Sequence, residues 1–350
     1  MPFRDVVNQH HAILLLRAAV RVARPAHAYL FVGPAGTGRR LLALGFAQFL
    51  NCQRPADGDA CGECRACRRI AERNHPDVRV LDIANGQYLV PVGKDYKGKE
   101  IPIDQIRALK QDAYYPPYEG RTKVYIIADA ELLSLGAANS LLKVLEEPPP
   151  NVIIILIAET TVPLPATITS RCQFVRCALI PTAEIERVLV ERHGASQERA
   201  RFLAALAAGR IGRAVAWAQS AEVLERRDRF LTHLVNMETA DPLGRLDAAE
   251  ELTRTKEQLP ERVGELLEIA ALWYRDLAVW KETQDPSLII NLDRRGEIEH
   301  WAAALAWDDL ARRIEATAAA RDSLERNVQP RILLESLFFK IAPQAVATTP

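Results

Sequence analysis

A glycine-rich loop between an apolar run and an amphipathic stretch constrains the fold of this chain more than any other feature. The run AYLFVG (28–33) is typical of a buried strand, the loop follows as GPAGTGRR (33–40), and RRLLALGFAQFL (39–50) has helical periodicity. A strand, a glycine turn and a helix N-terminus together place backbone N–H groups around an anion, and the helix dipole assists. This order predicts an α/β domain with a nucleotide-binding type of loop.

The loop departs from the phosphate-binding pattern G-x-x-x-x-G-K-[ST] at two positions that matter chemically. Gly33, Gly36 and Gly38 stand where glycines are expected. Arg39, however, replaces the lysine that bridges the outer phosphates, and Arg40 replaces the hydroxyl that binds magnesium. A planar guanidinium does not replace a compact ammonium, and a cation cannot ligate magnesium. The pattern indicates a degenerate nucleotide fold that does not hydrolyse; a tight turn without any ligand is the open alternative.

A second acidic position agrees with this interpretation. The run KVYIIADA (123–130) is expected to be a buried strand that ends with Asp129, a carboxylate suited to supporting magnesium. An active motor of this type would place a water-activating glutamate directly after it, and here that residue is Ala130. Glu131 is adjacent, but we expect it to point elsewhere because side chains alternate along a strand. The metal position and the water position are therefore both impaired.

Strands that alternate with helices in the first half predict a mostly parallel sheet with helices on both faces. NVIIILIAE (151–159) is another Ile-rich buried run, and LGAANSLLKVLEE (135–147) is helical and stops at three prolines. Beyond about residue 178 apolar residues recur at three- and four-residue spacing, which indicates amphipathic helices. We expect three domains: an α/β domain at 1–178, a small helical domain at 179–220 and a larger helical domain at 221–350.

Four cysteines cluster in NCQRPADGDACGECRACRR (51–69) with the spacing C-x8-C-x2-C-x2-C. Four thiolates close in sequence satisfy a tetrahedral zinc ion, and they leave no ligand position open. We therefore expect one structural zinc ion per chain, in an insert at 52–67. Iron–sulfur ligation uses similar spacings, and four unconnected reduced cysteines are the other alternative. The predicted ligands are Cys52, Cys61, Cys64 and Cys67.

Composition narrows the choice of partners. The chain has 45 basic and 45 acidic side chains, so its formal charge is zero. A protein that coats nucleic acid is normally more basic, and any such contact must be local or shared with partners. The chain shows no signal-type start and no apolar run of 18 residues. We expect a cytoplasmic protein with reduced cysteines and no membrane contact.

Several stretches, taken in order, resemble the clamp-loader branch of the AAA+ proteins. They are HAYLFVGPAGTGRR (27–40), the four-cysteine insert, AANSLLKVLEEPP (137–149) and TITSRCQ (167–173); RNVQPRILLESLFF (326–339) resembles the helix that closes the family's collar. The resemblance implies an α/β P-loop AAA+ domain, a small helical lid and an all-α collar. It implies partners as well: gamma/tau-type ATPase subunits and a delta subunit in a five-member ring, with the sliding clamp and primed DNA met through the complex.

The same resemblance assigns roles to the motif Ser170-Arg171-Cys172. Arg171 matches the arginine finger that reaches into a neighbouring subunit's ATP site, where a guanidinium stabilises the charge that develops during transfer. The alternative for Arg171 is a surface ion pair. The departures in the loop imply a stationary ring member that takes part in DNA replication without hydrolysing ATP, although ATP binding stays open. A weak ATPase motor is the alternative.

Two further positions keep alternatives open. In the turn GRIGR (209–213) Gly212 stands where active members of the family carry a nucleotide-sensing arginine, and Arg210 or Arg213 are candidates to replace it. A zinc-bearing nucleic-acid module is the competing class of function. Its basic face would consist of the arginines after the cysteines, and a solvated helix surface is the simpler explanation for them. These arginines are Arg65, Arg68, Arg69 and Arg73.

Overall fold

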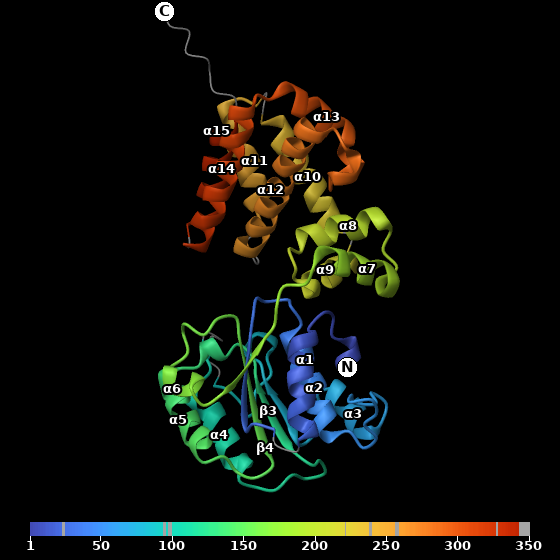
Figure 1. Cartoon of the computed structure of the whole chain (residues 1–350). Coiled ribbons are helices and arrows are strands. Elements are labelled where there is room, and N and C mark those ends of the chain that lie inside the picture. The colour runs from blue at the N-terminus through green and yellow to red at the C-terminus, as the bar shows by residue number, and fades with distance from the viewer. Residues whose placement is uncertain are drawn as a thin grey trace, which may run out of the picture. The chain divides into compact units, whose positions relative to one another are not determined.

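The first half of the chain forms a five-stranded parallel sheet in the order β2-β3-β4-β1-β5 (Figure 1). The structure, a computed structural model, describes residues 1–22, 25–93, 96, 100–220, 222–237, 240–255, 259–326 and 328–342. The predicted strands are present, although the one expected over 123–130 ends at Ile127. The strands are β1 (Ala28–Val32), β2 (Val78–Leu81), β3 (Lys123–Ile127), β4 (Val152–Ala158) and β5 (Gln173–Arg176).

The strand register brings the predicted site residues to one edge of the sheet. β1 lies between β4 and β5, with Leu30 opposite Leu156 on one side and Phe174 on the other. All strand pairs are parallel, so their carboxyl ends meet at the same edge. The glycine loop follows β1 at this edge, and Asp129 follows β3. Residues distant in the sequence therefore come together there.

Helices cover both faces of the sheet, which confirms the predicted α/β architecture. Side chains alternate along a strand, so Leu30 packs into the core on one face and Phe31 into the core on the other. Both faces are buried, and this explains why the strands are apolar throughout. One face is covered by α1 (His10–Arg21), α2 (Arg39–Asn51) and α3 (Arg65–Ala71), the other by α4 (Ile103–Ala113), α5 (Leu135–Glu146) and α6 (Ala166–Thr169).

Helix α5 shows how the sequence sets an element's limits. Ser134 is its N-cap, and its side chain accepts a hydrogen bond from the backbone N–H of Ala137 at 3.3 Å. Glu146 is the last helical residue, because the prolines from Pro148 onward cannot continue the helix. The α5 carboxyl end is thereby fixed next to α6, and the motif with Arg171 follows α6 directly.

The chain divides into two compact units. The first is Met1–Glu184 with Gly209–Arg213, and the second is Ile185–Ala208 with Ala214–Pro350. Within the second unit, Arg227 lies over the ring of Phe202 at 4.6 Å, so helices expected in separate domains pack together. The division into 1–178, 179–220 and 221–350 stays a prediction.

The helices that follow the sheet are α7 (Thr182–His193), α8 (Gln197–Leu206), α9 (Ile211–Ala218), α10 (Glu222–Asn236), α11 (Pro242–Thr253), α12 (Leu259–Thr283), α13 (Arg295–Ala304), α14 (Trp307–Glu325) and α15 (Pro330–Ile341).

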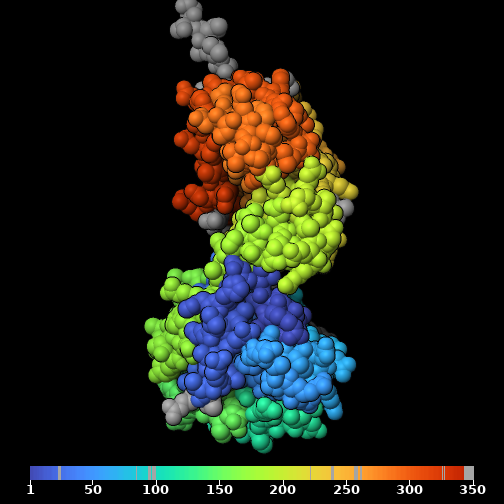
Figure 2. Space-filling view, turned by 45° about the vertical axis from the view of Figure 1, so that its right-hand side comes forward, coloured from blue at the N-terminus to red at the C-terminus, as the bar shows by residue number. Residues whose placement is uncertain are grey.

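Several remaining features complete the fold. The predicted C-terminal helix is present as α15, and it buries Leu333, Leu334 and Phe338. The N-terminal segment and the segment around residue 60 lie side by side on the first unit (Figure 2). Among the described residues no helix has both the length and the apolar character needed to cross a bilayer. Short 3-10 turns occur at Phe3–Asp5, Ile83–Asn85, Ala130–Leu132, Pro286–Leu288 and Leu292–Arg294.

Candidate functional site

The glycine loop joins β1 to α2, as predicted. Gly38 is the N-cap of α2 with φ of 93°, a left-handed conformation that glycine adopts at little cost. Gly33 is required for another reason, since a Cβ there would lie 2.0 Å from the carbonyl oxygen of Cys177. The hydroxyl of Thr37 donates to the carbonyl oxygen of Pro34 at 2.8 Å. The loop is thus fixed by its own hydrogen bonds and by the chain after β5.

The turn 209–213 packs directly on this loop within the first unit. The N–H of Gly212 donates to the carbonyl oxygen of Gly36 at 2.8 Å. A Cβ at Gly212 would lie 3.3 Å from the same oxygen, so a larger residue would crowd the loop. A Cβ at Gly36 would lie 3.1 Å from the Arg210 Cβ and 3.7 Å from the Arg213 Cγ. The two arginines suggested as sensor replacements therefore both lie against the loop.

Arg40 bridges two carboxylates at the position expected for metal chemistry. Its Nη2 lies 2.6 Å from Asp129 Oδ2, and its Nη1 lies 3.1 Å from Asp82 Oδ2. The Asp82 side chain is only 1% exposed, so this carboxylate depends on fixed partners for its countercharge. Burial raises the pKa of Asp129, and Arg40 beside it opposes that shift. One guanidinium thus pairs with both acids and offsets one of their two negative charges, at the place where a metal ion would bind.

Sequence reasoning missed Asp82. It directly follows β2, a strand of four residues that the apolar pattern did not reveal. The signal was available, because VRVL followed by Asp82 repeats the arrangement of a strand with Asp129 after it. The side chain of Asp82 also accepts hydrogen bonds from the backbone N–H and the side-chain amide of Asn85 at 3.2 and 2.7 Å.

Arg39, at the lysine position of the pattern, is buried among acids. Its Nη2 lies 3.6 Å from Glu159 Oε1, and its side chain is 7% exposed. Burial lowers the pKa of this guanidinium, and the charges of Glu159, Glu131 and Asp129 oppose that shift. The Nη1 atom has no hydrogen-bond partner among the described residues. Arg39 therefore has its countercharge inside the protein.

The region after Asp129 differs from the predicted strand. β3 ends at Ile127, Asp129 has φ of 53°, and Ala130 begins a 3-10 turn where it is fully buried. The Glu131 carboxylate accepts a hydrogen bond from the backbone N–H of Glu159 at 3.1 Å. The prediction that alternation along a strand turns Glu131 away was wrong in its reason, because Glu131 lies in this turn rather than in β3.

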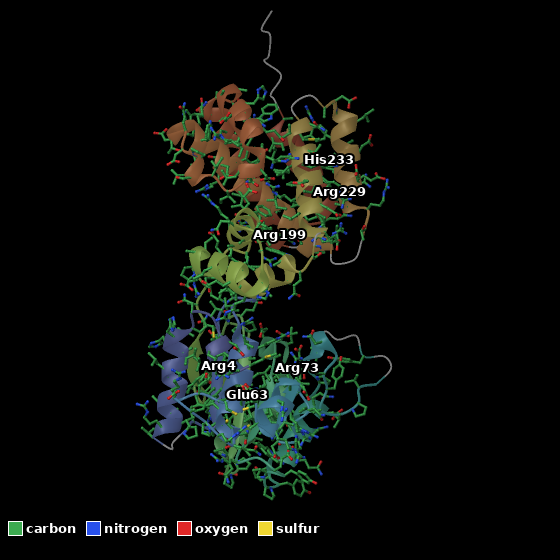
Figure 3. All side chains as sticks on the ribbon, turned by 90° about the vertical axis from the view of Figure 1, so that its right-hand side faces the viewer. Arg4, Glu63, Arg73, Arg199, Arg229 and His233 are labelled. Atoms are coloured by element: carbon green, nitrogen blue, oxygen red, sulfur yellow. The ribbon has the colours of Figure 1, made fainter. Side chains whose placement is uncertain are left out.

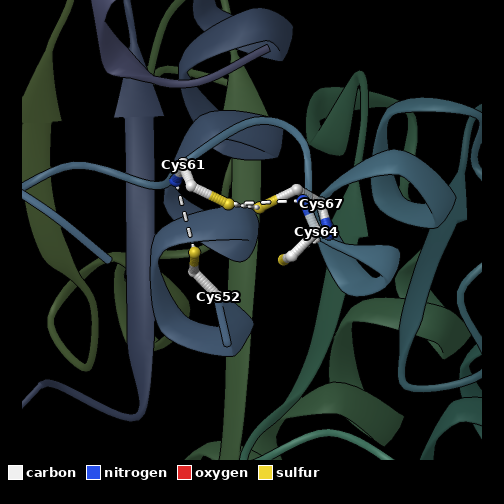
Figure 4. A group of neighbouring side chains, drawn as sticks. All are labelled: Cys52, Cys61, Cys64 and Cys67. Carbon is white, nitrogen blue, oxygen red and sulfur yellow. Dashed lines mark hydrogen bonds between the residues drawn. The ribbon is translucent and has the colours of Figure 1, made fainter. Parts of the chain in front are cut away.

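The four cysteines come together as predicted (Figure 4). Their sulfur atoms all lie within 4.8 Å of one another. The backbone N–H of Cys61 donates to the sulfur of Cys52 at 3.3 Å, and that of Cys64 donates to the sulfur of Cys61 at 3.3 Å. Burial alone would raise the pKa of Cys61, but the backbone N–H groups of Glu63 and Cys64 bring it down to about 6. These donors favour the thiolate of Cys61, whereas burial raises the pKa of Cys52 and Cys67. The residues fit a zinc ion because four sulfurs lie close enough together to bind one ion.

The cysteine insert is tied to the N-terminal segment. The Asp59 carboxylate accepts hydrogen bonds from the backbone N–H groups of Phe3 at 2.9 Å and Arg4 at 3.0 Å. The Arg4 guanidinium donates to the carbonyl oxygens of Ala60 and Cys61 at 3.1 and 2.8 Å. Figure 3 shows Arg4 and Glu63 on this part of the first unit. A metal at the cysteines would therefore also stabilise the start of the chain.

Arg171 makes its contacts within its own chain. Its Nη2 lies 2.8 Å from Glu146 Oε1, and its Nη1 donates to the carbonyl oxygen of Thr167 at 2.9 Å. The side chain is 35% exposed. Ser170, the C-cap of α6, donates from its hydroxyl to the same Thr167 oxygen at 3.3 Å. The surface ion pair is thus present in this chain, and a contact with a neighbouring subunit stays a prediction.

Two of the four arginines after the cysteines lie against one acid, and a third donates to a neutral amide. Arg69 pairs with Glu119, and Arg65 lies 3.8 Å from the same carboxylate. Arg73 donates to the side-chain oxygen of Gln87 at 2.9 Å. These contacts favour a solvated helix surface over a nucleic-acid interface.

Comparison with known proteins gives consistent matches. Residues 8–180 match the family described as DNA polymerase III, delta subunit. The chain is 29% identical over 330 residues to the DNA polymerase III subunit delta' of Bacillus subtilis, and this match covers 94% of each chain. It is 41% identical over 157 residues to the subunit delta' of Pseudomonas aeruginosa, covering 45% of this chain and 44% of that one. It is 38% identical over 171 residues to the subunit tau of Bacillus subtilis, covering 49% and 28%. These last two matches span less than half of each relative.

The parallel sheet, the glycine loop at its carboxyl edge and the helical C-terminal part give an α/β domain of the AAA+ type followed by an all-α part, and the matches to DNA polymerase III delta' and tau subunits identify a clamp-loader protein of that class. The chain belongs to the delta' family of DNA polymerase III clamp-loader subunits.

Proposed function

We propose that this chain is a clamp-loader subunit of the replicative DNA polymerase III and that it keeps a nucleotide fold without hydrolysing ATP. The observation that carries the proposal is the contact of Arg40 with Asp82 and Asp129. In an active loop a magnesium ion neutralises the β- and γ-phosphates and is held by a hydroxyl and a carboxylate. Here a fixed guanidinium takes up the carboxylates, and Ala130 offers no group to orient water. ATP binding without turnover is compatible with this arrangement.

The proposed contribution of the chain to hydrolysis is made in trans. Arg171 would place its guanidinium against the phosphates in a neighbouring gamma/tau-type ATPase, where it stabilises the charge of the transition state. The support is the Ser170-Arg171-Cys172 motif and the partial exposure of Arg171 on the first unit. The partners are the ATPase and delta subunits of a five-member ring, and the sliding clamp and primed DNA are met through that complex. As part of a DNA-directed DNA polymerase holoenzyme, the chain would support nucleotidyl transfer without catalysing it.

The proposed role of zinc is structural. Cys52, Cys61, Cys64 and Cys67 would hold one ion with all four sulfurs, so no position remains for a substrate or a reactive water. The ion would fix the insert, and the insert in turn holds the N-terminal segment through Asp59.

The direct test is ATP turnover by the purified chain in the presence of magnesium. We expect no turnover above that of a matched preparation of the Arg39→Ala variant, while a gamma/tau-type ATPase assayed in parallel serves as the positive control. Steady turnover that disappears in the Arg39→Ala variant would contradict the proposal and favour a weak motor.

A further inference from the structure

The guanidinium of Arg171 is held by two groups of its own chain. Nη2 pairs with Glu146 Oε1 at 2.8 Å, and Nη1 donates to the carbonyl oxygen of Thr167 at 2.9 Å. Glu146 is the last residue of α5 and Thr167 lies in α6, so both contacts come from elements of the first unit. The two terminal nitrogens that form the fork of an arginine on a phosphate are thus already engaged.

A phosphate cannot join this arrangement without a conflict of charge. A phosphate oxygen that bound the same Nη2 would lie within about 5 Å of the Glu146 carboxylate, and like charges at that distance repel. Each terminal nitrogen of Arg171 keeps a second N–H donor, but a phosphate bound there would lie beside the Glu146 carboxylate, so the two anions compete for the guanidinium. Glu146 therefore competes with any phosphate that is offered from outside the chain.

We propose that Glu146 is the positioning residue of Arg171, and that the triphosphate of a neighbouring subunit displaces it in competition for the guanidinium. This inference rests on the proposed function of Arg171. It names Glu146 as the residue that controls how readily the Arg171 side chain becomes available to a neighbouring subunit's triphosphate. The Glu146 side chain is 50% exposed and that of Arg171 is 35% exposed, so the pair exchanges at low cost. Loss of a partly exposed ion pair of this kind changes the equilibrium between the paired and the unpaired Arg171 side chain by up to about fivefold.

The first experiment examines the pair in the isolated full chain, where no partner is needed. Phenylglyoxal modifies guanidinium groups, and peptide mass spectrometry gives the rate at Arg171. Glu146→Gln should raise this rate by up to about fivefold. Glu147→Gln is the matched control, because it removes the neighbouring carboxylate of the same helix end, for which the structure records no ion pair among the described residues. Glu146→Asp keeps the charge and should restore most of the protection. An unchanged rate in Glu146→Gln overturns the inference.

The second experiment measures ATP hydrolysis by the reconstituted clamp loader. Glu146→Gln should raise kcat/KM by up to about fivefold, while Glu147→Gln has no effect. In an Arg171→Ala background Glu146→Gln should change nothing, since Glu146 acts only through Arg171. A fall in kcat/KM with Glu146→Gln overturns the inference, because the carboxylate would then assist delivery.

The two experiments separate failure of the inference from failure of the proposed function. Normal hydrolysis in Arg171→Ala, together with faster modification in Glu146→Gln, would overturn the proposed role of Arg171 and the inference that rests on it. An unchanged modification rate, together with impaired hydrolysis in Arg171→Ala, would overturn the inference alone.

Discussion

Replacing Arg40 with alanine should destabilise the first unit. The buried Asp82 carboxylate would lose its cation but keep the two hydrogen bonds from Asn85. Asp129 is 24% exposed and would regain part of its hydration. Breaking a fully buried ion pair costs about 3–5 kcal/mol, and these remaining partners reduce the loss we expect to about 2 kcal/mol.

The same variant should become sensitive to magnesium. Asp82 and Asp129 share one guanidinium, and without it their carboxylates offer the oxygen ligands that magnesium prefers. With a dissociation constant of about 1 mM, magnesium at about 10 mM would raise the free energy of unfolding of the Arg40→Ala variant by about 1.4 kcal/mol. The wild-type chain should show no such dependence, because Arg40 already supplies the charge.

The assay is hydrogen exchange of the β1 and β3 amides, read by mass spectrometry with and without magnesium. Tryptophan fluorescence is unsuitable because all five tryptophans belong to the second unit. Arg107→Ala is the control: its partner Asp104 is 72% exposed, and the change should be less than about 0.5 kcal/mol. If Arg40→Ala destabilised the first unit no more than Arg107→Ala does, and its hydrogen exchange did not change with magnesium, the view that Arg40 takes the place of a metal cation would be refuted.

Three further predictions address the rest of the first unit. Cys64→Ser should reduce zinc from about one ion per chain to near zero by elemental analysis and lower the melting temperature, whereas Cys172→Ser, outside the cluster, should keep the metal; equal zinc in both variants would exclude the site. Burial alone would raise the pKa of Asp77, but hydrogen bonds from three backbone N–H groups at 2.6–2.8 Å lower it overall. The ionised Asp77 therefore stabilises the folded state at pH values above its unfolded pKa of about 3.9, and this contribution is lost as the pH falls through the folded pKa. Asp77→Asn should therefore cost about 2–3 kcal/mol near neutral pH by denaturant titration, with a gap to wild type that narrows below about pH 4; a gap independent of pH would contradict this. Gly33→Ala should reduce the yield of folded protein, because its Cβ would lie 2.0 Å from the Cys177 carbonyl oxygen. A normal yield would contradict the claim that this position requires glycine.

The sequence was sufficient for the parts of the fold that rest on local patterns. The strand at 28–33, the glycine loop and the helix after it form one continuous signal, and the structure places them as predicted. The cysteines were found for the same reason, because their spacing is a local pattern typical of a metal site, and the structure brings the four sulfurs within 4.8 Å of one another.

Contacts between distant segments were not available from local patterns. β2 and β5 each have only four residues, and they are strands because of their pairing with β3 and β1 rather than because of their own periodicity. Asp82 was missed together with β2. The pairing of Arg171 with Glu146 joins the ends of two helices, and nothing in either stretch alone indicates it. The shift of Glu131 into a 3-10 turn follows from the end of β3 at Ile127, which the run of apolar residues conceals.

The most direct test of the account is ATP hydrolysis by a reconstituted clamp loader in which only the site adjoining this chain can turn over. Arg171→Ala should lower kcat at that site by at least about 100-fold without preventing assembly, and Arg171→Lys should recover little because it lacks the forked donors. Arg176→Ala, an exposed arginine on the nearby β5, is the control and should leave kcat unchanged. A kcat in Arg171→Ala within about twofold of wild type would contradict the claim that this chain acts by supplying an arginine to its neighbour.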